Sequence, residues 1–150
     1  MTTTSTGNNI IKLFCDPNVV VDAFSLRDYN YKPSQNLLRL IAAGQLKGYI
    51  CAKQITDLYY IFRKYFKTQE EIKAKIKVIT KLFEIIPLLK GDILHCLNTT
   101  MNDFEDAILD EVAKTNCIPY FVSNNIDDFT DSKSTVLTPE QFLTLFQLNK

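Results

Sequence analysis

Short apolar runs alternate along the chain with longer segments in which apolar residues recur every three or four positions. Such runs are typical of buried strands, whereas the recurring positions are typical of amphipathic helices. The pattern predicts five strands, over residues 10–15, 46–51, 85–89, 118–123 and 135–137. Because strands that alternate with helices usually pair in parallel through helical crossovers, the pattern indicates an α/β fold.

Start signals for helices lie between these runs. Pro17 is tolerated at the first position of a helix after the first strand, and Asp16 or Asn18 can cap that helix. After a loop over 28–33, Ser34 is expected to cap a second helix. Further helices are predicted over 55–66, from Thr68 with Glu71 as its capping box, over 92–97 and 99–114, and from Thr138 with Gln141.

Length and composition indicate one globular domain, which we expect to cover residues 10–148 of the 150. Residues 1–9 are polar and lack the basic and apolar regions of a signal peptide, so a disordered tail is expected there. The apolar runs stay shorter than the roughly 18 residues that span a bilayer. We therefore expect a cytoplasmic protein without membrane contact.

The cysteines and the histidine limit the chemistry. Four cysteines lie far apart without a Cys-x-x-Cys pair, which argues against a zinc site built from close cysteine pairs. Cys15, Cys51 and Cys117 lie in apolar runs and are expected to be buried, reduced thiols. His95 is the only histidine and is expected near a helix surface. Any chemistry must therefore depend mainly on carboxylates.

The formal charges sum to zero but are segregated along the chain. Residues 63–90 hold eight basic and three acidic side chains, whereas residues 92–131 hold nine acidic side chains and one lysine. A basic region beside an acidic one suits a protein that holds a polyanion in one part and cleaves it with a metal ion in the other. The alternative is that the lysine-rich helices are simply solvated faces.

The predicted helix 99–114 concentrates carboxylates. Asp103, Asp106 and Asp110 recur at intervals of three and four, so they stack along one helical face with about 5–6 Å between Cβ atoms. Like charges this close repel unless a cation lies among them, and Mg²⁺ is a hard cation that takes oxygen ligands. The alternative is a solvated acidic face. The neighbouring face is expected to pack into the core through Phe104, Ala107, Ile108 and Val112.

Other carboxylates fall where strands end. Asp16 ends the first strand, Asp57 lies in the helix after the second, and Asp127 and Asp128 follow the fourth. Ligands of open α/β sheets bind outside the carboxyl ends of the strands, so these residues and the acidic helix are expected to converge on one crevice. An oxygen-lined crevice of this kind would suit one or two Mg²⁺ or Mn²⁺ ions. Each aspartate has an alternative role as a helix cap or a turn residue.

Five short blocks, in the correct order, resemble the signature segments of PIN-domain ribonucleases, above all the branch related to the VapC toxins of bacterial toxin–antitoxin pairs. The blocks are 13–22, 48–60, 103–108, 121–129 and 136–142, within a similarity that extends from Ile10 to Phe146. The resemblance implies one PIN-like domain with three α/β/α layers around a twisted parallel sheet of four to five strands. It also implies an acidic centre that cleaves RNA with Mg²⁺ or Mn²⁺.

The resemblance implies roles for individual residues. Asp16 matches the first-strand aspartate of the family, and Asn18 matches an asparagine that helps to fix the following turn. Asp57 falls where the family has its second acidic residue. Asp106 matches the third, with Asp103 as an accessory carboxylate of the same helix. These four aspartates are the expected catalytic residues.

The fourth acidic position differs from the commonest family pattern, because Asn125 stands where many members have aspartate. Asp128 is near enough in the sequence to compensate, and Ser123 and Asn125 are expected to support the site. The expected metal ligands are therefore Asp16, Asp103, Asp106 and Asp128.

VapC-like proteins usually pair with a small antitoxin and many form homodimers, so the resemblance implies both partners besides an RNA substrate. An arginine of the antitoxin would enter the acidic crevice. The dimer surface is expected around residues 59–66, where Tyr60, Tyr65 and Phe66 are too many for one buried face. The alternative function is a non-catalytic PIN-like RNA-binding or protein-interaction module, and metal binding separates it from the enzyme.

Overall fold

The structure, a computed structural model, describes residues 10–25, 31–101, 103–129, 131–132 and 134–146. It confirms the α/β fold, with one sheet of five parallel strands in the order β3-β2-β1-β4-β5. Residues 1–9 and 147–148, which carry the expected tail and the end of the predicted domain, lie outside the described residues. The strands are β1 (Ile11–Cys15), β2 (Leu46–Cys51), β3 (Glu84–Ile86), β4 (Tyr120–Val122) and β5 (Thr135–Leu137).

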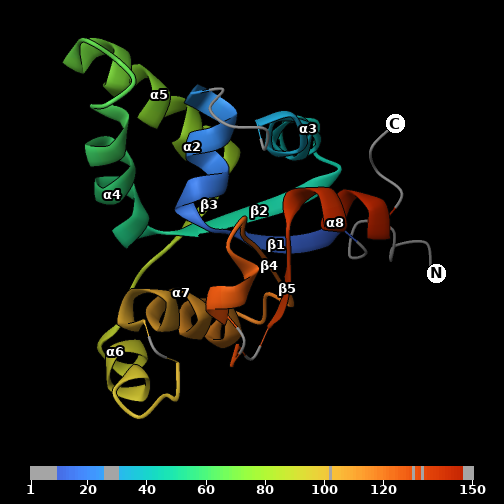
Figure 1. Ribbon diagram of the computed structural model, residues 1–150. Coiled ribbons are helices and arrows are strands. Elements are labelled where there is room, and N and C mark those ends of the chain that lie inside the picture. The colour runs from blue at the N-terminus through green and yellow to red at the C-terminus, as the bar shows by residue number, and fades with distance from the viewer. Residues whose placement is uncertain (1–9, 26–30, 102, 130, 133, 147–150) are drawn as a thin grey trace, which may run out of the picture.

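Helices cover both faces of the sheet, so the molecule has three layers (Figure 1). One core lies between the sheet and α2, α3, α4, α5 and α8, and a second core lies between the opposite face and α6, α7 and η1. The helices are α2 (Pro17–Ser25), α3 (Tyr31–Ala42), α4 (Ala52–Phe62), α5 (Gln69–Leu82), α6 (Lys90–Cys96), α7 (Phe104–Thr115), η1 (Ile126–Phe129, a 3-10 turn) and α8 (Pro139–Leu145).

The central strand β1 explains why the apolar runs are continuous. Successive side chains of a strand point to opposite faces, so Leu13 and Cys15 enter the first core while Phe14 enters the second. All three side chains are fully buried. The ring of Phe14 stacks on that of Phe121 from β4, with centroids 5.3 Å apart. The part of a strand that helices cover on both faces must be apolar, and Lys12, near the start of β1, is exposed.

The capping boxes predicted at Thr68 and Thr138 are confirmed. The cap predicted at Ser34 is wrong, because α3 already begins at Tyr31 and Ser34 is wholly buried within the helix. Pro33, which marked the end of the expected loop, lies in the first turn of α3, where the missing N–H removes no hydrogen bond. Residues 28–30 of that loop lie outside the described residues.

Two further burial predictions are wrong. Phe104 is the first residue of α7 and is 47% exposed, while Leu109 and Ala113 join Ala107 and Val112 in the core. Cys117 is exposed, with a φ of 58°, because the chain turns there after α7 and β4 begins only at Tyr120. No helix in the described part of the chain is both long and apolar enough to cross a membrane.

The strand order creates a crevice at one position. The chain adds β2 and β3 on one side of β1 and then returns to place β4 on the other side. At such a switch point the connections diverge from neighbouring strand ends and leave a crevice outside the carboxyl edge of the sheet. Asp16 follows β1 and Ser123 follows β4 directly at this edge.

Candidate active site

Asp16 is the fixed centre of this crevice. Its backbone N–H donates to the carbonyl of Val122 at 2.9 Å, which continues the pairing of β1 with β4 by one residue. Its Oδ2 accepts a 2.7 Å hydrogen bond from the buried hydroxyl of Ser123. The backbone N–H of Asn18 also donates to the Asp16 side chain, so the expected cap of α2 is Asp16. Asp16 is only 6% exposed and therefore holds its carboxylate in one orientation.

The turn after β4 contacts Asp16 through Ser123. The backbone N–H of Asn125 donates to the Ser123 hydroxyl at 3.0 Å, so that this hydroxyl directs its own proton to Asp16. Asn125 itself is exposed. Next to it, the Asn124 amide donates to the buried carboxylate of Asp22 on α2, which ties the turn to that helix.

Gln54 is a positioning residue that the sequence analysis missed. This fully buried side chain accepts from the backbone N–H of Cys51 at 2.6 Å and donates to the carbonyl of Cys15 at 2.8 Å. It therefore joins the ends of β2 and β1 to the start of α4. Gln54 stands three residues after Cys51, the spacing of a capping box, but a cysteine in place of serine or threonine obscured the signal.

The acidic helix places two carboxylates at the crevice. Asp103 caps α7, because its Oδ1 accepts from the backbone N–H of Asp106 at 3.0 Å. Asp106 follows in the first turn and lines the same cleft as Asp16. The third member of the predicted row, Asp110, is different: it is 3% exposed and accepts a hydrogen bond from Ser132. Of the expected row of three carboxylates, Asp106 therefore lines the cleft, Asp103 caps the helix and Asp110 makes a structural contact.

Electrostatics show that the carboxylates converge. Desolvation by burial raises the pKa of Asp16 from 3.8 to about 6, although hydrogen bonds from Ser123 and Asn18 oppose the rise. Desolvation, together with the charges of Asp103, Asp16 and Asp128, raises the pKa of Asp106 from 3.8 to about 7. Asp128 acts on both groups, so the residue expected to replace the fourth acidic position does lie near them.

Asp57 lines the cleft but is already paired. The ammonium of Lys53 lies 2.9 Å from Asp57 Oδ2 and 3.6 Å from Glu105 Oε1, so it joins α4 to the start of α7. The sequence analysis missed Lys53, although the i,i+4 spacing of Lys53 and Asp57 on a helix is a recognisable pairing signal. These contacts raise the pKa of Lys53 although burial opposes the rise, so the ammonium keeps its charge at neutral pH.

The cleft has a volume of about 350 Å³ and is lined by Asp16, Pro17, Asn18, Lys53, Asp57, Tyr60, Ile61, Glu105, Asp106 and Leu109. The carboxylate oxygens in this lining are metal ligands that suit Mg²⁺ and Mn²⁺ better than soft metals. Within the described ranges, no three His, Cys, Asp or Glu side chains are already grouped closely enough to ligate one ion. Asp16 and Asp106 are nevertheless candidate ligands for a divalent cation, because both carboxylates line the cleft and lie near other negative charges.

His95 lies apart from this cleft. It is on α6, 70% exposed in its side chain, with Nδ1 2.9 Å from the carboxylate of Glu111 on α7. Its expected surface position is confirmed. The pair joins α6 to α7. The charged side chains that line the cleft are carboxylates and Lys53.

Comparisons with known proteins agree with this geometry. A PIN-domain family model matches residues 12–127. Ribonuclease VapC1 of Aquifex aeolicus (strain VF5) is 30% identical over 139 residues, which cover 89% of this chain and 94% of that protein. Among solved structures, VapBC2 from Rickettsia felis bound to a promoter DNA fragment has a TM-score of 0.63 at 17% identity, covering 85% of this chain and 98% of that one. A toxin–antitoxin complex from Klebsiella pneumoniae has a TM-score of 0.63 at 21% identity, covering 85% and 97%.

Proposed function

The chain belongs to the PIN-domain family, and from that premise we propose that it is an endoribonuclease that hydrolyses RNA phosphodiester bonds with Mg²⁺ or Mn²⁺. The observation that carries the proposal is the meeting of Asp16 and Asp106 in one cleft at the switch point of the sheet. Each carboxylate is partly desolvated and lies near other negative charges. Clustered acids of this kind destabilise the fold unless a cation compensates them, so a functional role is the simplest reason for them.

Asp16 and Asp106 would hold the ion, with Asp103 and Asp128 contributing from the rim. A bound divalent ion lowers the pKa of a coordinated water and neutralises charge on the scissile phosphate. The Ser123 hydroxyl fixes the Asp16 carboxylate at the lining of the cleft. Besides the proposed metal ion, Lys53 supplies a positive charge at the cleft, and its ammonium holds Asp57 in place. Asp57, expected as a catalytic residue, therefore acts in this proposal through Lys53 or through water.

Cleavage of a fluorescently labelled single-stranded RNA tests the proposal. We expect cleavage in Mn²⁺ or Mg²⁺ and none in EDTA, and we expect Asp16→Asn and Asp106→Asn each to reduce the rate by roughly 100-fold or more. Asp127→Asn is the matched control, because Asp127 is an exposed acid beside Asp128. Cleavage that survives both EDTA and Asp106→Asn would refute the assignment. RNA binding without any cleavage would favour the non-catalytic PIN-like module.

We further propose that the protein is the toxin of a toxin–antitoxin pair, blocked by a small antitoxin. The named complexes among its structural neighbours support this, as does an acidic cleft that an arginine guanidinium could enter as a bidentate partner. Co-expression with the product of an adjacent reading frame should yield a complex with reduced RNA cleavage. Full cleavage activity in that complex would contradict an inhibitory role.

A homodimer remains a proposal of its own. Of the residues expected at the dimer surface, Tyr65 is 39% exposed, and Phe66 packs edge-on against Phe62 with centroids 5.5 Å apart. Tyr60, which is 71% exposed, lines the acidic cleft and lies outside the interface that we propose. Light scattering at micromolar concentration should find twice the chain mass. A single species of 17.2 kDa would contradict the dimer. The buffer needs a reductant, because the exposed thiol of Cys117 can join two chains covalently.

A further inference from the structure

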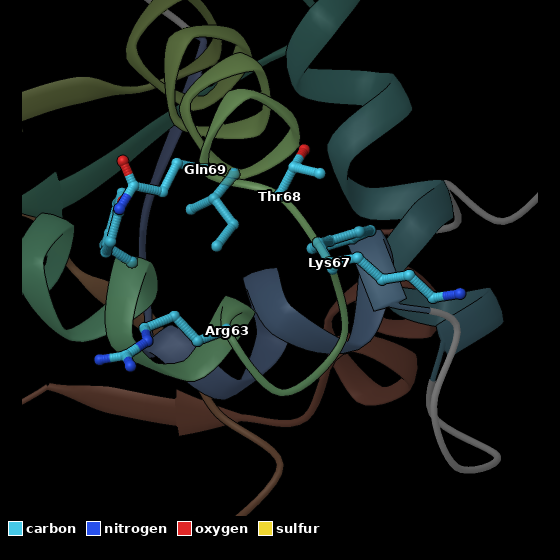
Figure 2. Close-up of a pocket in the computed structure, with 7 residues that line it drawn as sticks. Arg63, Lys67, Thr68 and Gln69 are labelled. Atoms are coloured by element: carbon cyan, nitrogen blue, oxygen red, sulfur yellow. The ribbon is translucent and has the colours of Figure 1, made fainter.

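The last turn of α4 separates two hollows on the surface. On one side is the acidic cleft, whose lining includes Tyr60 and Ile61. On the other side is a pocket of about 450 Å³ at the corner between α4 and α5 (Figure 2). Tyr59, Arg63, Phe66, Lys67, Thr68, Gln69 and Ile72 line this second pocket. The end of α4 is thus a ridge between the acidic cleft and this second pocket.

Tyr60 and Arg63 form the top of this ridge. The guanidinium carbon of Arg63 lies 5.2 Å from the centroid of the Tyr60 ring, so the two side chains stack although Tyr60 remains 71% exposed. A surface cation–π pair by itself contributes only about 0.5–1 kcal/mol to stability. Proteins also bind single-stranded RNA with an exposed aromatic ring beside a guanidinium, because the ring stacks on a base and the guanidinium contacts a phosphate.

The second pocket favours passage of a strand over a closed anion site. Figure 2 shows Arg63 and Lys67 extending to opposite sides of the pocket and not toward one point within it. The start of α5 is already capped, because the Thr68 hydroxyl accepts from the N–H of Glu71 and the Glu71 carboxylate accepts from the N–H of Thr68. Glu70 adds a second negative charge in this first turn. The phosphates of a passing strand would therefore contact Arg63 and Lys67 separately, and not the capped helix start.

We propose that Tyr60 and Arg63 form a binding ridge for single-stranded RNA, in which a base beside the scissile phosphate stacks on Tyr60 and Arg63 binds a neighbouring phosphate. The strand then continues across the second pocket toward Lys67. This inference rests on the proposed ribonuclease function and names the residues that hold its substrate. The segregated charges fit the same path, since residues 63–90 carry eight basic side chains against three acidic ones.

Fluorescence anisotropy with a labelled single-stranded RNA in EDTA measures this binding without cleavage. Tyr60→Ala should weaken binding by roughly 5- to 150-fold, the range for loss of one stacked base, whereas Tyr60→Phe should retain it. Arg63→Ala should reduce the slope of log affinity against log salt by about 0.7, the value for one phosphate contact on a single strand. In the presence of Mn²⁺, Tyr60→Ala should raise KM and leave kcat nearly unchanged.

Matched controls separate the ridge from general surface effects. Leu94→Ala removes an exposed apolar side chain of α6 that lines neither hollow, and Lys81→Ala removes an exposed charge at the far end of α5. Both should bind RNA like the wild type. Wild-type affinity of Tyr60→Ala together with an unchanged salt slope of Arg63→Ala would overturn the ridge, while metal-dependent cleavage by the wild type would leave the ribonuclease function standing. A wild type that neither binds nor cleaves RNA would overturn both.

Discussion

Replacing Asp106 by asparagine should stabilise the metal-free protein at alkaline pH and should not do so in acid. The pKa of Asp106 rises from 3.8 to about 7 on folding, so the folded state binds this proton more tightly than the unfolded state does. The free energy of unfolding therefore falls as the pH rises from about 4 to about 7, and the loss is complete above that window. Asparagine mimics the protonated acid and avoids the loss.

The magnitude follows from the pKa rise. At about 1.36 kcal/mol per pH unit, a rise from 3.8 to about 7 corresponds to about 4 kcal/mol. Asp106 is only partly buried, so solvent screening leaves about half of this, near 2 kcal/mol. At a urea m-value of about 2 kcal/mol per molar, the midpoint should rise by about 1 M at pH 8.

Urea unfolding in EDTA at pH 4.5 and pH 8 is the assay. The advantage of Asp106→Asn should be small at pH 4.5 and near its maximum at pH 8, whereas Asp127→Asn should stay within about 0.5 kcal/mol of the wild type at both. Adding Mn²⁺ at 100 times its dissociation constant should stabilise the wild type by about 2.7 kcal/mol and the variant much less. If Asp106→Asn destabilised the protein at both pH values, the carboxylate would be a structural acceptor and the argument from clustered charge would be wrong.

Three further predictions follow from the same contacts. Calorimetric titration should detect Mn²⁺ binding that the double variant Asp16→Asn with Asp106→Asn abolishes, because amides are weaker ligands for a hard cation; unchanged binding would refute the ligand assignment. Lys53→Met should tighten Mn²⁺ binding several-fold, on the order of 1 kcal/mol, by releasing Asp57 and Glu105 from the ammonium, and weaker binding would contradict this. Ile79→Ala should cost about 2–5 kcal/mol in urea unfolding, because Ile79 is fully buried, and clearly more than Ile76→Ala at a half-buried position.

The sequence predicted most strands because burial on both faces leaves a strong signal. The runs 46–51 and 135–137 coincide with β2 and β5, whereas the expected run 85–89 contains only part of the short edge strand β3 (Glu84–Ile86). Helix starts were less predictable, since α4 begins with Cys51 and Gln54 and α3 includes Pro33 in its first turn. At the start of α4, the Gln54 side chain accepts from the backbone N–H of Cys51, so this cap lacks the commonest residues, Ser and Thr.

The sequence predicted residues of the candidate site only where their place at the end of a strand or the start of a helix determines where they lie. Asp16 and Asp106 follow a strand end and open a helix, so the topology brings them together. Asp110 continues the spacing of Asp103 and Asp106, but its side chain forms a hydrogen bond with Ser132. The sequence alone does not show that these two residues are neighbours. The partner Glu105 likewise decides the role of Lys53, and it lies on a different helix.

The hydrogen bond between Ser123 and Asp16 spans 107 positions of the chain, and this separation has a consequence in time. A ribosome makes the amino-terminal end first at about 5–20 residues per second, so Asp16 waits roughly 5–20 s before its partner exists. Until β4 docks beside β1, the carboxylate lacks the contact that orients it. The proposed active site therefore lacks this contact until β4 has left the ribosome. The order of the strands thus delays completion of the site until most of the chain has been synthesised.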